Sequence, residues 1–491
     1  MSTAVAAPTR PLTERSALDL ARGIREGEVT SREIVEAHVE RLREVQPRIN
    51  AVAADRFDAA LEDADAADRR VAEASDPDEL PPLLGVPCTI KESIALAGMP
   101  NCAGLISRRE HRATETAPAA ARVLEAGAIP LAVTNVSELT MWIEAQNFVY
   151  GRTNNVYDQS RVAGGSSGGE GAAVGSGGSP IGLGTDIGGS IRLPAFFNGV
   201  FGHKCSAWMV PNSGHFPAAE GEVTRMLSLG PLARRAEDLM PLLRIVAGPD
   251  GIDPYTREVE LGDPADVSLD GLPVVLAEDT SYVPVRRELR DAREQAAGAL
   301  VAAGASLRRV PLSSMRRALD YYLTALRAGS DKRVRDLLED EMEETARLTL
   351  GRAGWGALRG RGPHTVSMVI LLATEALAAR TPERLTQRAL AAGKALAREV
   401  EDVVGDGVLL HPPHPRVAPK HGRTVGRPWV ITPTAVFNLL GLPATQVPLG
   451  LNAAGLPLGV QVVAGMDRDH VAIAVALELE RAFGGWVPPP A

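Results

Sequence analysis

The sequence predicts an α/β protein in which a mixed central β-sheet is covered by helices on both faces. Strand-like apolar runs alternate with amphipathic helical segments along most of the 491 residues. The composition, 45% hydrophobic and 23% charged, is that of a globular protein with a sizeable core. We therefore expect a single large domain over residues 1–491, including a helical elaboration over about 313–404 and a closing part over about 407–485.

Each expected element follows from a local pattern of residues. Thr30 is a good helix N-cap, and the apolar residues that follow it recur on one face of a helix. The predicted strands cover residues 80–91, 129–134, 181–186, 273–279, 306–312 and 458–465. The other predicted helices cover residues 116–126, 285–302 and 470–483, with one more that begins at Ser137. Between residues 164 and 193 we expect a helix, a turn and a strand.

Charge and cysteine content exclude several classes of protein. A formal net charge of −9 argues against nucleic acid as a partner, because phosphate binding needs a basic face. The three cysteines, Cys88, Cys102 and Cys205, form no CxxC motif, which indicates a reducing compartment and packing roles. The most apolar stretch, residues 367–379, is too short to cross a bilayer and contains Glu375. We expect a soluble, cytoplasmic protein without stable membrane insertion.

The segment 164–193, GGSSGGEGAAVGSGGSPIGLGTDIGGSIRL, is the most unusual part of the chain. It has neither of the glycine-rich patterns that bind phosphate. It contains G-x-S-x-G at 164–168, but the predicted strand follows these serines, whereas a hydrolase nucleophile elbow needs the strand before them. A merely structural glycine-packed loop and an acyl-transfer site both remain open from the residues themselves.

An acyl-transfer site needs a nucleophile and main-chain N–H groups that face a developing oxyanion. Ser190 follows two glycines that allow the main chain to curl around it. The candidate donors are the N–H groups of Ile187, Gly188, Gly189 and Ser190.

The same chemistry needs a base. Lys91 ends a buried strand, and a buried lysine loses its proton readily. Ser166 can relay the proton between Lys91 and the nucleophile. An ion pair between Asp186 and Arg192 would fix the shape of the turn.

Three stretches resemble the amidase signature family of hydrolases. They are residues 164–204, the lysine segment 85–105 and the closing strands 442–464, so that the signature core spans about 85–205. Residues 132–158 look most similar to the fatty acid amide hydrolase branch of this family. The resemblance implies a single amidase-signature domain.

The resemblance also implies roles for individual residues. The family's Ser–cis-Ser–Lys triad falls on Ser190, Ser166 and Lys91, with a cis peptide bond between Gly165 and Ser166. Ser167 falls beside the relay serine as a supporting residue. Residues implied for substrate binding are Met141, Trp142 and Gly165.

The implied activity is hydrolysis of a small-molecule amide, aryl amide or carbamate with an apolar or aryl group, with esters as side substrates. No metal or cofactor is implied, and a homodimer is possible. Because the base must be uncharged, activity is expected to rise toward alkaline pH. Two alternatives remain: a glutamine-hydrolysing subunit that passes ammonia to partners, and a non-catalytic binding protein on the same fold.

Two features invite other interpretations. The family commonly has proline after the glycine–x–lysine element, whereas here Lys204 is followed by Cys205, and we expect a neutral loop change. His411 and His414 lie in a proline-rich stretch without a companion ligand cluster. We therefore expect loop histidines and no metal site.

Overall fold

A computed structural model describes residues 10–330, 332–340 and 362–490. In these residues a mixed sheet of 11 strands forms the centre of the protein. Its strands are β1 (Val52–Asp55), β2 (Pro87–Lys91), β3 (Ile129–Thr134), β6 (Ile181–Asp186), β7 (Phe201–Lys204), β8 (Ser228–Ala233), β9 (Pro273–Glu278), β10 (Ser306–Pro311), β11 (Val408–His411), β12 (Ala444–Leu451) and β13 (Pro457–Ala464). Their order across the sheet is β1-β3-β2-β6-β8-β7-β12-β13-β11-β9-β10.

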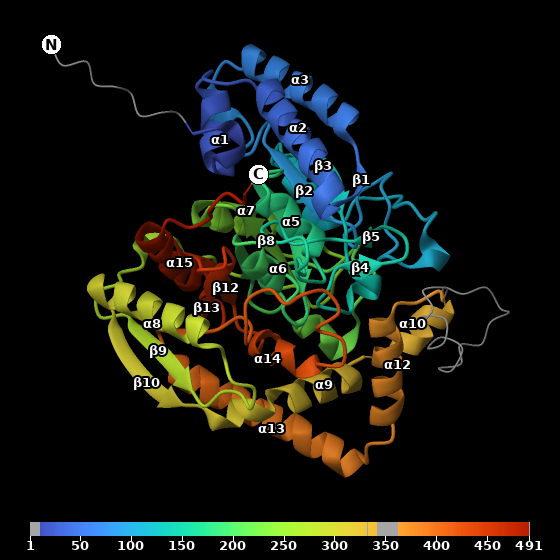
Figure 1. Cartoon of the computed structure of the whole chain (residues 1–491). Helices are drawn as coiled ribbons and strands as arrows, with labels where there is room; N and C mark the ends of the chain where they lie inside the picture. The colour runs from blue at the N-terminus through green and yellow to red at the C-terminus, as the bar shows by residue number, and fades with distance from the viewer. Residues whose placement is uncertain (1–9, 331, 341–361, 491) are drawn as a thin grey trace.

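The helices flank this sheet, and those nearest the N-terminus gather at one end of the molecule (Figure 1). They are α1 (Ala17–Arg25), α2 (Ser31–Ile49), α3 (Phe57–Glu73), α4 (Pro118–Glu125), α5 (Gly168–Gly175), α6 (Arg192–Phe197), α7 (Leu239–Val246), α8 (Arg287–Ala302), α9 (Ala318–Ala328), α10 (Val334–Asp340), α12 (Val366–Ala378), α13 (Glu383–Val404), α14 (Thr432–Leu440) and α15 (Asp469–Phe483). A separate hairpin pairs β4 (Gln146–Asn147) with β5 (Gly151–Arg152).

Strand β9 shows that helices cover both faces. Side chains alternate along a strand, and Val274 and Leu276 pack into the cluster that α8 and α15 also join. Val275 and Ala277 point the other way, into the cluster formed with α9, α13 and α14. The predicted two-sided cover of a mixed sheet is thus confirmed.

Three neighbouring parallel strands position the candidate site. β2 lies between β3 and β6 and is parallel to both. Because the carboxyl ends of parallel strands meet at one edge of a sheet, Lys91, Thr134 and Asp186 end their strands on the same side. The fully buried helix α5, built mainly of glycine and alanine, packs against all three strands. Side chains at this edge therefore lie under a close helical cover.

Most predicted elements occur at or near their expected bounds. The predicted strands 129–134 and 181–186 have these bounds in the structure. Helix α2 begins at Ser31 after a capping box between Thr30 and Glu33. The strand expected over 80–91 is shorter and begins at Pro87, because the residues before it form a turn.

The prediction of a helix that begins at Ser137 is wrong. Only a 3₁₀ turn, Glu138–Thr140, forms there. Leu139 and Thr140 have φ angles of 52° and 57°, in the left-handed region that ends a right-handed helical path.

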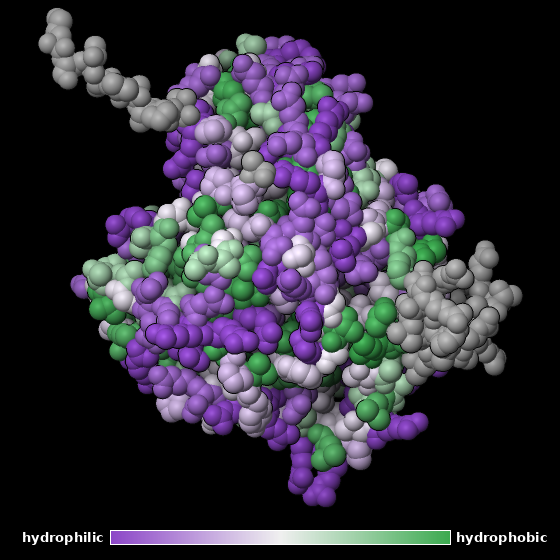
Figure 2. Space-filling view, in the orientation of Figure 1, coloured by the Kyte–Doolittle hydropathy of each residue, from purple (hydrophilic) through white to green (hydrophobic). Residues whose placement is uncertain are grey.

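Between about 313 and 404 the described residues form helices α9, α10, α12 and α13, and residues 331 and 341–361 lie outside the described part. Helices α10 and α12 project from one side of the molecule, and apolar residues gather where they meet the body (Figure 2). Met368 and Leu372 of the most apolar stretch are buried there, in a cluster shared with Leu105 and Leu139. None of the described helices is both long and apolar enough to span a membrane.

Candidate active site

Lys91 lies at the centre of the candidate site. Its side chain has no exposed surface, and its Nζ donates hydrogen bonds to Ser166 Oγ at 2.7 Å and to Thr185 Oγ1 at 2.5 Å. Burial lowers the pKa of Lys91 to about 7, because it removes the water that would solvate the charged ammonium. Three buried carboxylates act in the opposite direction, namely Asp186, Glu170 and Glu92. A substantial fraction of Lys91 is therefore uncharged at neutral pH and can accept a proton.

The bond between Gly165 and Ser166 is cis, as the family resemblance implies. The main chain of residues 142–144 passes so close that a Cβ at Gly165 would lie 2.6 Å from the Trp142 carbonyl oxygen. Only glycine fits there. The Ser166 carbonyl accepts a hydrogen bond from the N–H of Ser137 at 3.3 Å. This bond helps to fix the main chain of Ser166, the candidate for the proton relay.

Ser190 lies in the turn after β6, beside the segment that carries Ser166. The N–H of Ser167 donates to the Ser190 carbonyl at 3.3 Å, and Ser167 Oγ lies 3.2 Å from the Thr185 carbonyl. Ser190 is 8% exposed, whereas Ser166 is 1% exposed. Of the three predicted triad residues, Ser190 is the most accessible from outside.

The predicted ion pair between Asp186 and Arg192 is present. Both side chains are fully buried, and two guanidinium nitrogens each lie 3.0 Å from a carboxylate oxygen. Arg192 is also held by Gln461 at 2.9 Å and Asn438 at 2.6 Å. Burial alone would raise the pKa of Asp186, but Arg192 holds it well below its ordinary value. The pair therefore keeps both charges at this turn.

Three of the four predicted oxyanion donors remain free. The Gly189 N–H donates to Asp186 Oδ1 at 2.7 Å, so this prediction needs correction: the carboxylate that shapes the turn occupies that donor. Within the described residues, no acceptor takes the N–H groups of Ile187, Gly188 or Ser190.

Side chains from distant helices hold the carbonyls of the same turn. Tyr322 Oη of α9 donates to the Ile187 carbonyl at 3.0 Å, and Thr434 Oγ1 of α14 donates to the Gly188 carbonyl at 2.7 Å. Since these carbonyls are fixed from one side, the N–H groups of the turn have a defined direction. The turn is thus preorganised by parts of the chain far from it in sequence.

Sequence reasoning missed four residues of this arrangement: Thr185, Glu170, Tyr322 and Thr434. Glu170 carries a detectable signal, because a single charged residue among glycines and alanines of a buried helix requires partners. Thr185 stands within the motif already singled out, next to Asp186. Tyr322 and Thr434 lie in ordinary helical stretches and carry no such signal.

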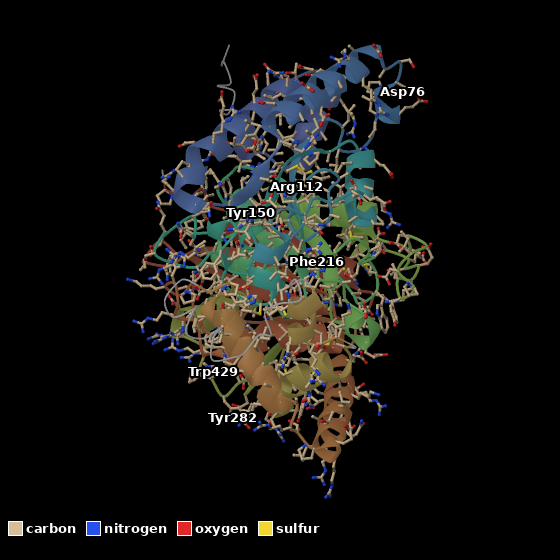
Figure 3. All side chains as sticks on the ribbon, turned by 90° about the vertical axis from the view of Figure 1, so that its right-hand side faces the viewer. Asp76, Arg112, Tyr150, Phe216, Tyr282 and Trp429 are labelled. Carbon is tan, nitrogen blue, oxygen red and sulfur yellow. The ribbon has the colours of Figure 1, made fainter. Side chains whose placement is uncertain are left out.

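The three residues predicted to bind substrate differ in burial, and Gly165 is buried next to Ser166. Met141 and Trp142 are half-buried. Trp142 Nε1 donates to Thr424 Oγ1 at 3.0 Å, and Met141 packs against the apolar cluster that includes Met368. Phe216 joins that cluster; in Figure 3, which looks at this side, it is labelled between the N-terminal helices and the helical block. Their role toward a substrate stays a prediction.

The remaining cysteine and histidine candidates are buried. All three cysteines are free thiols in buried positions. His411 and His414 direct Nδ1 toward carbonyl oxygens of their own loop, at 2.9 Å and 2.6 Å. In the part of the chain that the structure describes, no three histidine, cysteine or acidic side chains are grouped closely enough to hold a metal ion.

Known proteins match almost the whole chain. The family model described as Amidase matches residues 33–472. Fatty-acid amide hydrolase 2-A of Danio rerio is 42% identical, and the alignment covers 98% of this chain and 91% of that protein. Fatty-acid amide hydrolase 2 of Homo sapiens is 41% identical with the same coverage. A crystal structure of an amidase has a TM-score of 0.78 and 29% identity, and covers 96% of this chain and 100% of its own.

Proposed function

This chain belongs to the amidase family and is a hydrolase that acts on amides, and we propose that it does so through an acyl-enzyme on Ser190. The observation that carries the proposal is the 2.7 Å hydrogen bond between Lys91 Nζ and Ser166 Oγ inside a fully buried site. A lysine that titrates near neutrality and contacts a hydroxyl is suited to act as a general base.

The proposed reaction begins with two linked proton transfers. Uncharged Lys91 takes the proton of Ser166, which takes the proton of Ser190 as the Ser190 oxygen attacks the amide carbonyl. The carbonyl oxygen gains negative charge and is stabilised by the free N–H groups of Ile187, Gly188 and Ser190.

The intermediate then collapses and releases the amine. The C–N bond breaks while the proton on Lys91 returns through Ser166 to the leaving nitrogen, which leaves an ester on Ser190. A water molecule attacks this ester with the same proton path in reverse. The products are a carboxylic acid and the regenerated enzyme, so atoms and charge balance over the cycle.

We further propose that the substrate has an extended apolar acyl group. Met141 packs against a cluster of apolar side chains that includes Leu338, Met368 and Leu372 of the helical elaboration. Burying one methylene group in such surroundings contributes about 0.8 kcal/mol to binding. The fatty-acid amide hydrolases that are 41–42% identical to this chain bear names that agree with this substrate class. Aryl amides, carbamates and esters with apolar groups are the further substrates to compare.

The purified chain alone tests the proposal. Initial rates are measured on long-chain and short-chain primary amides, an anilide, a carbamate, an ester and glutamine. We expect kcat/KM to be at least about tenfold higher for the long-chain than for the short-chain amide, which corresponds to about 1.4 kcal/mol. We expect Ser190→Ala to lower kcat by more than about a thousandfold while the protein remains folded.

A fluorophosphonate probe, followed by peptide mass spectrometry, locates the nucleophile independently. Labelling should fall on Ser190 and be absent in Ser190→Ala. Activity on glutamine alone would favour the amidotransferase alternative. Undiminished turnover by Ser190→Ala would overturn the proposed mechanism.

A further inference from the structure

Glu170 is a buried carboxyl group beside the candidate base. It lies in the first turn of α5 and has no exposed surface. Each oxygen accepts one threonine hydroxyl at 2.7 Å, Oε2 from Thr89 and Oε1 from Thr134. A Cβ at Gly182 would lie 1.9 Å from Oε2, so the sheet leaves room for this carboxyl by having glycine there.

The register of the strands places Glu170 on the same face of the sheet as Lys91. Thr89 precedes Lys91 by two residues on β2, and side chains two apart on a strand point to the same face. Thr134 is the direct partner of Lys91 in the ladder with β3. Both hydroxyls that hold the carboxyl therefore flank the position of Lys91.

Other ionisable groups surround this pair, and each is held by its own partners or by burial. Asp186 is paired with Arg192, and its charge also raises the pKa of Lys91. The Glu92 carboxylate accepts two main-chain N–H groups and the hydroxyl of Tyr150. Burial lowers the pKa of His215 to about 3, so that it is uncharged.

The Cys88 thiol also interacts electrostatically with Glu170. Burial raises the pKa of Cys88 far above neutrality, so it is also uncharged. Burial raises the pKa of Glu170 to about 7, while the threonine hydroxyls and Lys91 act to lower it. Glu170 in turn raises the pKa of Lys91, so each of the two groups favours the charged form of the other.

We propose that Glu170 is a positioning residue whose carboxylate sets the proton affinity of Lys91, and thereby the lower pH limit of the reaction. This inference rests on the proposed role of Lys91 as the base. A negative charge near Lys91 stabilises its ammonium form and so raises the pKa of Lys91. The uncharged amine is then a stronger base, but it forms only at higher pH. The two threonine hydroxyls stabilise the ionised carboxylate and so maintain this effect.

Replacing the carboxylate by a neutral amide has two linked consequences. In Glu170→Gln the lysine loses its proton more easily, so the acidic limb of the kcat/KM profile moves to lower pH by about one unit. The plateau rate falls at the same time, because a weaker base removes the proton of Ser166 less readily. A merely structural role would lower the rate without moving the limb.

The experiment compares kcat/KM from about pH 5 to pH 10 on one ester substrate for the wild type and the variants. Thr134→Val removes one hydroxyl from the carboxylate, so it should move the limb in the same direction by less. This isosteric variant also keeps the test decisive if Glu170→Gln does not fold. Asp238→Asn is the control, because Asp238 is another fully buried carboxyl whose pKa burial raises to about 7, but it holds the N-terminus of α1. It should leave the limb in place.

The two levels of the proposal fail in different ways. A wild-type profile without an acidic limb, or full activity in Lys91→Met, would overturn the role of Lys91 itself. A wild-type limb that stays unmoved in both Glu170→Gln and Thr134→Val would overturn the inference about Glu170 alone.

Discussion

Glu138 holds the N-cap residue of α12, Thr365. Its Oε2 accepts the main-chain N–H of Thr365 at 2.8 Å, and its Oε1 lies 2.6 Å from His364 Nδ1. All three residues are buried. Glu138 is close in sequence to Met141, which we propose to lie on the substrate side of the site. The contact of Glu138 with Thr365 and His364 therefore fixes the helical elaboration next to that side.

Removing this contact should affect substrates according to their length. In Glu138→Ala the buried N–H and imidazole lose their acceptor, which costs about 1–3 kcal/mol of unfolding free energy. We expect kcat/KM to fall further for a long-chain amide than for a short ester, because only the long chain reaches α12. Thermal unfolding and the ratio of the two rates measure both effects. Asp68→Asn is the control, because Asp68 accepts the main-chain N–H groups of Ser31 and Arg32 at the start of α2 instead, and it should leave the ratio unchanged.

Thr434 should support catalysis through the turn that it holds. Thr434→Val removes the hydroxyl that donates to the Gly188 carbonyl, so the neighbouring N–H groups lose their fixed direction. We expect kcat to fall by about tenfold with little change in KM, because the loss concerns transition-state stabilisation. Thr432→Val on the same helix removes a hydroxyl bonded to the Trp429 carbonyl and should leave kcat near the wild-type value. Equal effects of the two substitutions would contradict this role.

The ionisation of Asp186 should make the free energy of unfolding depend on pH in the acid range. Its pKa in the folded protein lies below its ordinary value, so its stabilisation is complete above about pH 4, near the unfolded pKa, and is lost as pH falls through the folded pKa. Asp186→Asn leaves the charge of Arg192 buried without its anion and should cost about 3–5 kcal/mol. Urea unfolding at a series of pH values measures both; a variant as stable as the wild type at neutral pH would refute the argument.

The activity should rise through neutrality. With a Lys91 pKa of about 7, the uncharged fraction falls about tenfold for each pH unit below that value. The kcat/KM of the wild type should therefore increase from acid pH and level off on the alkaline side. A profile that is flat or falls over this range would show that the essential base is another group.

Local patterns predicted the elements of the sheet better than the connections between them. The strand at 181–186 and the helix after Thr30 depend on neighbouring residues, and both were predicted correctly. The segment after Ser137 was predicted as a helix because its tertiary contacts, such as that of Glu138 with Thr365, do not register in local propensity.

The same difference holds for the candidate site. The ion pair of Asp186 and Arg192 spans six residues and was predictable from the motif. The occupation of the Gly189 N–H by Asp186 was not, because the local sequence does not fix which main-chain N–H groups of the turn the carboxylate accepts. Tyr322 and Thr434 reach the turn only through the packing of remote helices.

The meeting of β2, β3 and β6 at one edge has a consequence for how activity arises during folding. The hydrogen bond from Lys91 to Ser166 joins positions 75 residues apart, and that from Thr434 to Gly188 joins positions 246 apart. Contacts of such long range form only after extensive loop closure. A nascent or truncated chain that ends before α14 therefore lacks a support of the turn, and hydrolytic competence should emerge only once translation has passed that helix.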